Sequence, residues 1–209
     1  MFDWDGTLID STATIARSIQ SAAADLGLPV PPLERARHVI GLGLRDALAH
    51  AVPELAAADA PVFASRYRHH YLSQEQSLEL YDGARELLVA IADAGVRLGV
   101  ATGKTHAGLT RALNATGLDK VFAATRCADQ TEPKPHPAML LELMHELRVP
   151  ADRMLMIGDT THDLAMAASA GAHAVAVTHG AHPREKLAAL APLALIDSLD
   201  ELRQWLISR

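Results

Sequence analysis

The stretch Met1-Phe-Asp-Trp-Asp-Gly-Thr-Leu-Ile-Asp-Ser11 decides how the rest of the chain can be interpreted. The two apolar residues that open it are typical of the end of a buried strand, and Gly6 marks a turn away from that strand. Because side chains alternate along a strand, we expect the carboxylates of Asp3 and Asp5 to point to the same side. Burying two unpaired carboxylates costs free energy, and a hard divalent cation such as Mg²⁺ prefers oxygen ligands of this kind. The stretch therefore predicts a cation site at a strand end, with a simple polar turn as the alternative.

Three further short motifs follow along the chain: Val100-Ala-Thr-Gly-Lys104, Glu132-Pro-Lys-Pro135 and Gly158-Asp-Thr-Thr-His-Asp163. Taken in order with the Asp-x-Asp-Gly-Thr motif at residues 3–7, they resemble the four signature motifs of the haloacid dehalogenase (HAD) superfamily. Within it, the chain is similar to the phosphoglycolate-phosphatase-like branch with a helical cap. The resemblance runs nearly from end to end. Each motif alone is weak, but all four in this order are specific.

Composition and charge exclude several classes of protein. A chain of 209 residues, 49% hydrophobic and 21% charged, suits one large globular domain or a domain with an insertion. The formal net charge of -6 argues against general affinity for nucleic acid or anionic membranes. No apolar run approaches the ~20 residues of a membrane helix, and acidic residues stand where a signal peptide carries positive charge. The lone Cys127 excludes an internal disulfide framework, so we expect a buried thiol and a cytoplasmic protein.

Hydrophobic spacing predicts an α/β fold, namely a Rossmann-like doubly wound parallel sheet with an inserted all-helical cap domain. Residues 1–11 and 81–209 would form the core domain and residues 12–80 the cap, since nothing between Ser11 and Leu80 is typical of a strand. Apolar runs predict core strands at residues 96–101, 121–124, 154–157, 174–177 and 193–196. Helical spacing predicts cap helices near 12–26, 33–39, 44–51 and 60–76, and core helices near 84–94, 107–115, 138–147, 164–170 and 199–206.

The first strand is shorter than usual. Only two residues precede Asp3, whereas strands commonly run ~5–6 residues. We expect either an apolar run upstream of Met1 or a truncated central strand.

Polar residues follow several of the expected strands. Asp3, Thr102 and Asp159 each fall at or just after a strand's carboxyl end, which is where open parallel sheets bind ligands. This agreement does not depend on the family resemblance.

The resemblance assigns a role to each carboxylate. Asp3 would be the nucleophile that forms an aspartyl-phosphate, and Asp5 the general acid and base. Asp159 would bind Mg²⁺ directly, beside the Asp3 carboxylate and the Asp5 backbone carbonyl. Asp163 would lie in the metal's outer shell and orient its waters or Lys134; otherwise it is a first-turn acid that the helix dipole favours.

Three residues are expected to bind phosphate. The Thr102 hydroxyl and the Gly103 amide can donate to phosphate oxygens, and glycine permits close backbone approach. Thr102 or Thr105 could also cap a helix. Lys134 stands between two prolines that restrict the backbone and would aim its ammonium at the site, with an exposed loop lysine as the alternative.

The remaining candidates lie outside these motif positions. We expect Lys104 and His162 to be solvated. The eleven histidines show no metal-binding spacing and no cysteine partner, so we assign them to surface and loop positions. Gly41 and Arg45 are candidate specificity residues of the cap, because glycine allows close approach and arginine can hold a carboxylate such as that of glycolate. Arg45 could equally be solvated.

The sequence thus predicts a Mg²⁺-dependent phosphomonoester hydrolase for a small phosphorylated metabolite, acting as a monomer or homodimer. On the resemblance, phosphoglycolate is the leading substrate. A sugar phosphomutase similar to β-phosphoglucomutase and a pyrophosphatase of the same branch remain open. Dehalogenation and phosphonate hydrolysis are disfavoured because Asp5 is retained. The alternative from a different class is a catalytically silent binding protein on this fold.

Overall fold

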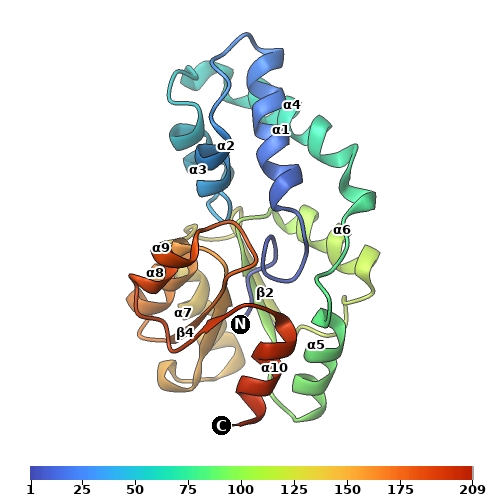
Figure 1. The fold of residues 1–209 in the computed structure, drawn as a ribbon, viewed down its shortest axis with the longest axis vertical. Helices are drawn as coiled ribbons and strands as arrows, with labels where there is room; N and C mark the ends of the chain where they lie inside the picture. The colour runs from blue at the N-terminus through green and yellow to red at the C-terminus, as the bar shows by residue number, and fades with distance from the viewer. Residues whose placement is uncertain (209) are drawn as a thin grey trace.

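The computed structural model describes residues 1–208, with a helical part at the top of Figure 1 and an α/β part below it. The helices are α1 (Thr12–Asp25), α2 (Leu33–His38), α3 (Leu44–Ala51), α4 (Ala60–Leu72), α5 (Ala84–Asp93), α6 (His106–Thr116), α7 (Ala138–Leu147), α8 (Thr161–Ser169), α9 (Arg184–Ala188) and α10 (Leu199–Ile207). The strands are β1 (Gly99–Thr102), β2 (Ala124–Cys127), β3 (Leu155–Gly158), β4 (His173–Val177) and β5 (Leu195–Ile196). Short 3₁₀ helices lie at Ala57–Asp59, Glu75–Ser77 and Ala151–Arg153. Within residues 1–208, no helix has the length and apolar character needed to cross a membrane.

Phe2 joins the strands into one sheet. Strand β1 pairs with β2, and β4 pairs with both β3 and β5, all in parallel. Phe2 forms parallel bridges with Val100 of β1 and Ile157 of β3. The Asp3 amide donates to the Ile157 carbonyl at 2.9 Å. The order is therefore β2–β1–Phe2–β3–β4–β5, and Asp3 leaves the centre of the sheet toward the carboxyl ends of its neighbours.

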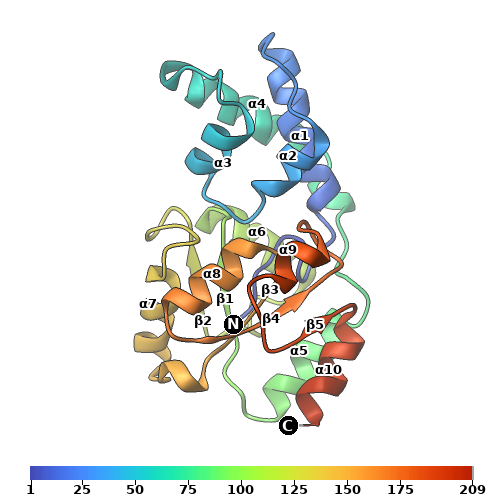
Figure 2. The same cartoon turned by 60° about the vertical axis from the view of Figure 1, so that its left-hand side comes forward.

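Both faces of the sheet are buried. Val100, Ile157 and Val175 share a hydrophobic cluster with residues of α5, α6 and α10. The adjacent strand residues Ala101 and Met156 belong to a second cluster with residues of α7 and α8. Figure 2 shows α7 and α8 on one side of the strands and α5 and α10 on the other. This alternation produces the predicted doubly wound α/β fold.

The helices α1–α4 bury a core of their own. Ile19 of α1, Leu48 of α3 and Phe63 of α4 lie in a cluster separate from those of the sheet. The two chain crossings to the α/β part run side by side, because Ile9 pairs with Leu80. This arrangement suits the division into a core of residues 1–11 and 81–209 and a cap of residues 12–80, which stays a prediction.

Several elements differ from the expected ones. Strand β1 begins at Gly99 instead of Val96, and β5 has only 2 residues. Strand β2 begins at Ala124, where the sequence pattern predicted an end, because its middle residues Thr125 and Arg126 are half-exposed at the sheet edge and polar. Helix α4 stops at Leu72 and is followed by a 3₁₀ turn. Helix α9 has 5 residues and was not predicted, since so short a helix shows no clear periodicity.

The amino terminus lies against the strand start of β3. The Met1 ammonium donates to the Leu155 carbonyl at 2.7 Å. Burial lowers the pKa of this amino group to about 5. The apolar run expected upstream of Met1 stays a prediction.

Candidate active site

Three carboxylates meet at the carboxyl end of the sheet. Asp3 follows Phe2, Asp159 follows β3, and Asp163 lies in the first turn of α8. One oxygen from each lies within 4.8 Å of the others, and all three residues are fully buried. We call Asp3, Asp159 and Asp163 the acidic trio.

Lys134 supplies the positive charge for the acidic trio. Its Nζ lies 2.7 Å from Asp3 Oδ1 and 2.7 Å from Asp163 Oδ1, and its side chain is completely buried. Burial lowers the pKa of Lys134, but attraction to Asp163 and Asp3 outweighs burial, so the net pKa lies above its ordinary value. The lysine is therefore charged, and the alternative of an exposed loop lysine is wrong.

When all three carboxyls are ionised, the acidic trio has more negative charge than one lysine neutralises. Asp3 Oδ2 is buried and has no hydrogen-bond partner among residues 1–208. Burial raises the pKa of Asp3 well above its ordinary value, although Lys134 opposes this shift. Burial also raises the pKa of Asp159 to about 7, against hydrogen bonds from Thr7 Oγ1 at 2.6 Å and the Ala181 amide at 2.7 Å. A divalent cation would relieve this excess charge, and carboxylate oxygens are ligands that Mg²⁺ prefers.

The start of α8 holds Asp163 in place. The Thr160 hydroxyl accepts a hydrogen bond from the Asp163 amide at 3.3 Å. In return, Asp163 Oδ2 accepts from the Thr160 amide at 3.0 Å and from its hydroxyl at 2.6 Å. This capping box occupies one carboxylate oxygen and leaves the other for Lys134. Asp163 is thus both a first-turn acid and the partner that positions Lys134.

Asp5 stands apart from the acidic trio and contacts a second lysine. Its Oδ1 accepts from Ser11 Oγ at 2.8 Å and lies 3.1 Å from Lys104 Nζ. Lys104 also donates to the Tyr71 hydroxyl at 2.8 Å, and its Nζ lies 4.6 Å from that ring's centroid. Only 9% of the Lys104 side chain is exposed. The expectation that Lys104 is solvated is therefore wrong, because it joins Asp5 to helix α4.

The turn after β1 lies directly beneath the helical part. Thr102 is fully buried, and its Oγ1 accepts from the Lys104 amide at 3.2 Å. A Cβ at Gly103 would lie 2.6 Å from the Leu42 carbonyl oxygen and 2.7 Å from that of Gly41. In this structure the backbone of Gly41 and Leu42 packs closely against Gly103, which the lack of a side chain at Gly103 permits. Phosphate binding by Thr102 and Gly103 stays a prediction.

The structure brings only one of the two expected specificity residues to the site. Gly41 has a φ of +90°, and a Cβ there would lie 3.9 Å from Asp3 Oδ2. It lines a cavity of about 460 Å³ between the helical part and the sheet, which we call the cap–core cavity. Arg45 is exposed and does not line this cavity. A larger cavity of about 730 Å³ lies near Phe2 and Leu98, and the acidic trio does not line it.

Comparison with known proteins agrees with this geometry. A sequence model of the family described as "Haloacid dehalogenase-like hydrolase" matches residues 1–177. The chain belongs to this family. The "Probable phosphatase IndB" of Dickeya dadantii is 36% identical over 208 residues, which cover 97% of this chain and 90% of that protein. A "Phosphoglycolate phosphatase" of Rhodospirillum rubrum is 34% identical over 218 residues, covering 99% of this chain and 89% of that protein.

Solved structures of similar fold support the same assignment. A predicted phosphoglycolate phosphatase from Haemophilus somnus has a TM-score of 0.85 at 27% identity, covering 100% of this chain and 96% of that one. A hydrolase from Pseudomonas syringae has a TM-score of 0.91 at 23% identity, covering 99% and 96%, and shows likeness of fold. The predicted family and fold class are confirmed.

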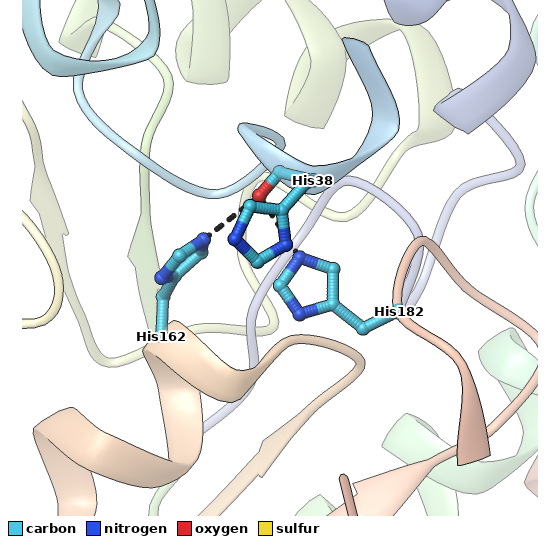
Figure 3. A group of neighbouring side chains, drawn as sticks. All are labelled: His38, His162 and His182. Carbon is cyan, nitrogen blue, oxygen red and sulfur yellow. Dashed lines mark hydrogen bonds between the residues drawn. The ribbon is translucent and has the colours of Figure 1, made fainter. Parts of the chain in front are cut away.

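This HAD-like hydrolase also brings together three histidines, shown in Figure 3. His38 ends α2, His162 lies in the first turn of α8, and His182 follows β4. The Nε2 atoms of His162 and His182 each lie 2.9 Å from the His38 carbonyl oxygen. We call these residues the histidine trio. Their assignment to surface and loop positions is wrong in one respect, because the rings of α2, α8 and the loop after β4 contact one another and His182 is buried.

Hydrogen bonding leaves the histidine trio poorly suited to a metal ion. The Thr161 amide donates to His182 Nδ1 at 3.0 Å, so the proton of the neutral ring lies on Nε2, where it is donated to His38. Burial lowers the pKa of His182 to about 4, which keeps the ring neutral. The rings of His38 and His182 stack with centroids 4.7 Å apart at 18°, so their in-plane lone pairs do not converge. The trio is therefore a contact that joins α2 to the start of α8 and to the loop after β4.

Proposed function

We propose that this chain is a Mg²⁺-dependent phosphomonoester hydrolase that works through an aspartyl-phosphate on Asp3. The hydrolase class follows from the family, and relatives named as phosphatases support phosphomonoester hydrolysis. Phosphoglycolate, the substrate in several of those names, is the leading candidate and the first to test. No described contact favours the phosphomutase or pyrophosphatase alternative.

The observation that carries the proposal is the buried Lys134 between Asp3 and Asp163, at 2.7 Å from each. A carboxylate that attacks a phosphoryl group brings two negative charges together, and a fixed cation offsets their repulsion. Lys134 is placed to do this, and Asp163 keeps it there. Asp3 would attack phosphorus, forming the Asp3–phosphorus bond as the bond to the leaving oxygen breaks.

Asp5 would handle the proton. It would give a proton to the leaving oxygen and later take one from the water that hydrolyses the aspartyl-phosphate. Its position fits these two duties, because it is held by Ser11 and Lys104 at the edge of the cap–core cavity.

The acidic trio fits the expected metal ion. The Asp3 oxygen that lacks a partner is the kind of buried acceptor that a cation satisfies. Asp3, Asp159 and the Asp5 backbone carbonyl would hold Mg²⁺. Asp163, which pairs with Lys134 and caps α8, would lie outside the ligand set. When bound, the ion supplies charge neutralisation between phosphate and carboxylates.

The test is phosphate release from phosphoglycolate and from 4-nitrophenyl phosphate, with and without EDTA. We expect release with Mg²⁺, loss in EDTA, and recovery when Mg²⁺ is added in excess. Full activity after exhaustive chelation would remove the metal from the mechanism. No release from either ester would favour the catalytically silent binding protein.

Several predictions on partners stay open to measurement. We infer a small phosphorylated metabolite as partner, no nucleic-acid or membrane partner, a cytoplasmic location, and a monomer or homodimer. Light scattering on the purified protein would distinguish the two oligomeric states.

A further inference from the structure

The cap–core cavity lies beside Asp5, and this position indicates which half of the substrate it holds. Asp5 lines the cavity, whereas the acidic trio, Thr102 and Lys134 do not. In the proposed mechanism Asp5 protonates the leaving oxygen, so the leaving group must begin next to Asp5 and extend away from the phosphate. The cavity is then the compartment for the leaving group, a step that rests on the proposed function.

Apolar side chains from three cap helices form much of the cavity wall. They are Ile15 and Ile19 of α1, Leu44 and Leu48 of α3, and Tyr67 and Tyr71 of α4. The two tyrosine rings lie one helical turn apart, with centroids at 6.0 Å and planes at 25°. Lys104 fixes the Tyr71 ring through its hydroxyl at 2.8 Å. Such a wall favours an apolar or flat aromatic occupant, because apolar surface gains free energy on leaving water.

Two of the cations that line the cavity already have anionic partners. Lys104 pairs with Asp5 at 3.1 Å, and Arg111 pairs with Glu75 at 3.2 Å. Arg68 also lines the cavity, but it is exposed and therefore hydrated. A carboxylate that enters the cavity would lose water without reaching an unpaired cation in the interior, which is unfavourable. The wall therefore does not favour the second anionic group of phosphoglycolate.

The size of the cavity leads to the same conclusion. Its volume of about 460 Å³ lies in the range of ~300–1,000 Å³ that is usual for small-molecule sites. If each non-hydrogen atom takes roughly as much room as a water molecule, about 30 Å³, the five such atoms of glycolate would fill about a third of it. The remaining space would hold water against apolar walls.

We propose that the substrate of this chain is the phosphate monoester of an alcohol that carries an apolar or aromatic group of about ten non-hydrogen atoms. The apolar group occupies the cap–core cavity against Leu44, Leu48 and the tyrosine pair. Its hydroxyl oxygen, once the bond to phosphorus breaks, receives the proton from Asp5. This substrate class fits the cavity better than phosphoglycolate, which the names of the relatives favour.

The first experiment compares primary-alcohol esters, so that the leaving oxygens are chemically similar. The values of kcat/KM are measured with Mg²⁺ for phosphoglycolate, ribose 5-phosphate, benzyl phosphate and 2-naphthylmethyl phosphate. We expect the two aromatic esters to exceed the two polar ones by tenfold or more. Equal or higher values for phosphoglycolate or ribose 5-phosphate would overturn the proposal and leave the proposed phosphatase function intact. If no ester is hydrolysed, the proposed function fails and this inference fails with it.

The second experiment changes the wall. Leu44→Lys places an unpaired cation in the cavity, and Ala49→Lys places the same side chain on an exposed position of the same helix. We expect Leu44→Lys to lower kcat/KM for benzyl phosphate about tenfold and to raise it for phosphoglycolate, while Ala49→Lys changes neither. Equal effects of the two variants would contradict the proposal.

A binding measurement covers the case in which Leu44→Lys does not fold. Calorimetry on Asp3→Asn, which keeps the wild-type wall, should show benzyl phosphate binding at least tenfold more tightly than phosphoglycolate. Tighter binding of phosphoglycolate would refute the assigned substrate class.

Discussion

The acidic trio and the histidine trio look alike in composition and differ in hydrogen bonding. Each brings three residues of a metal-ligating type within 4.8 Å. In the acidic trio, an oxygen of Asp3 has no partner within residues 1–208. In the histidine trio, both nitrogens of His182 are already bonded. The difference teaches that proximity identifies a candidate ligand set, and that unused lone pairs identify the set that needs an ion.

The acidic trio and the histidine trio also differ in how burial affects their ionisation. Burial raises the pKa of Asp3 and of Asp159, so ionisation of either carboxyl costs free energy unless a cation is added. Burial lowers the pKa of His162 and of His182, so these rings are stable in their neutral form. An added cation would stabilise the first group and would have to displace existing hydrogen bonds in the second.

The largest expected effect is that of Asp3→Asn. Turnover should fall to background, because the amide is a poor nucleophile, while the melting temperature should not decrease. The matched variant in the other trio, His162→Gln, keeps a donor for the His38 carbonyl and should retain most of the activity. Phosphate release and circular dichroism on both proteins check this. Turnover near the wild-type rate in Asp3→Asn would exclude the aspartyl-phosphate.

Asp5→Asn should have the next largest effect, since Asp5 lies outside the acidic trio and would act only on protons. We expect kcat to fall by ~10²–10⁴-fold, which is usual for loss of a general acid. Metal affinity should change little, because the backbone carbonyl of residue 5 is retained. Single-turnover kinetics with a Mg²⁺ titration measure both quantities, and a loss below about tenfold would mean that Asp5 contributes only its backbone.

Lys134→Met removes the cation that the acidic trio does have. Uncompensated burial of Asp3 and Asp163 should lower the free energy of unfolding by ~3–5 kcal/mol in the absence of metal. Mg²⁺ should recover part of this loss, because it supplies charge to the same carboxylates. Urea unfolding with and without Mg²⁺ tests both statements. A variant as stable as the wild type without metal would show that the ion pairs of Lys134 with Asp3 and Asp163 contribute little to stability.

The smallest expected effect is that of His182→Leu. It removes an acceptor for the Thr161 amide and a donor to the His38 carbonyl, so we expect a loss of about 1–3 kcal/mol in unfolding free energy. Zinc titration by calorimetry sharpens the comparison with the acidic trio. We expect no tight zinc binding that depends on His182. Submicromolar binding that disappears in His182→Leu would show that the histidine trio is a metal site after all.

The motif residues were predictable because each follows a strand at the sheet's carboxyl end. Asp3 and Asp159 follow neighbouring sheet positions, so their meeting needs only the parallel topology. Lys134 required the family resemblance, since nothing in Glu132–Pro135 alone distinguishes a buried lysine from an exposed one. Strand β2 lies later in the chain than predicted, because the prediction searched for apolar runs. An edge strand such as β2 can contain polar residues such as Arg126.

The contacts between the helical part and the sheet could not be predicted from spacing. Lys104 lies 99 positions from Asp5 and 33 from Tyr71 along the chain, so its partners depend on how α4 packs. The only available signal was its place just after a strand's carboxyl end. The histidine trio joins segments 144 and 124 residues apart, and its residues have no common motif. Arg45 was chosen for its charge, and the helix turns it outward to solvent.

The bare backbone at Gly103 sets how closely the two halves of the molecule can meet. The Leu42 carbonyl oxygen lies 2.6 Å from the ideal Cβ position of residue 103, which is too close even for the methyl group of an alanine. Glycine at position 103 therefore allows the backbone of residues 41 and 42 to pack directly against the turn after β1. A side chain at position 103 would clash with the backbone of the loop that carries Gly41. That loop would have to move away from Asp3. The distance between the Gly41 loop and the sheet thus depends on the lack of a side chain at position 103.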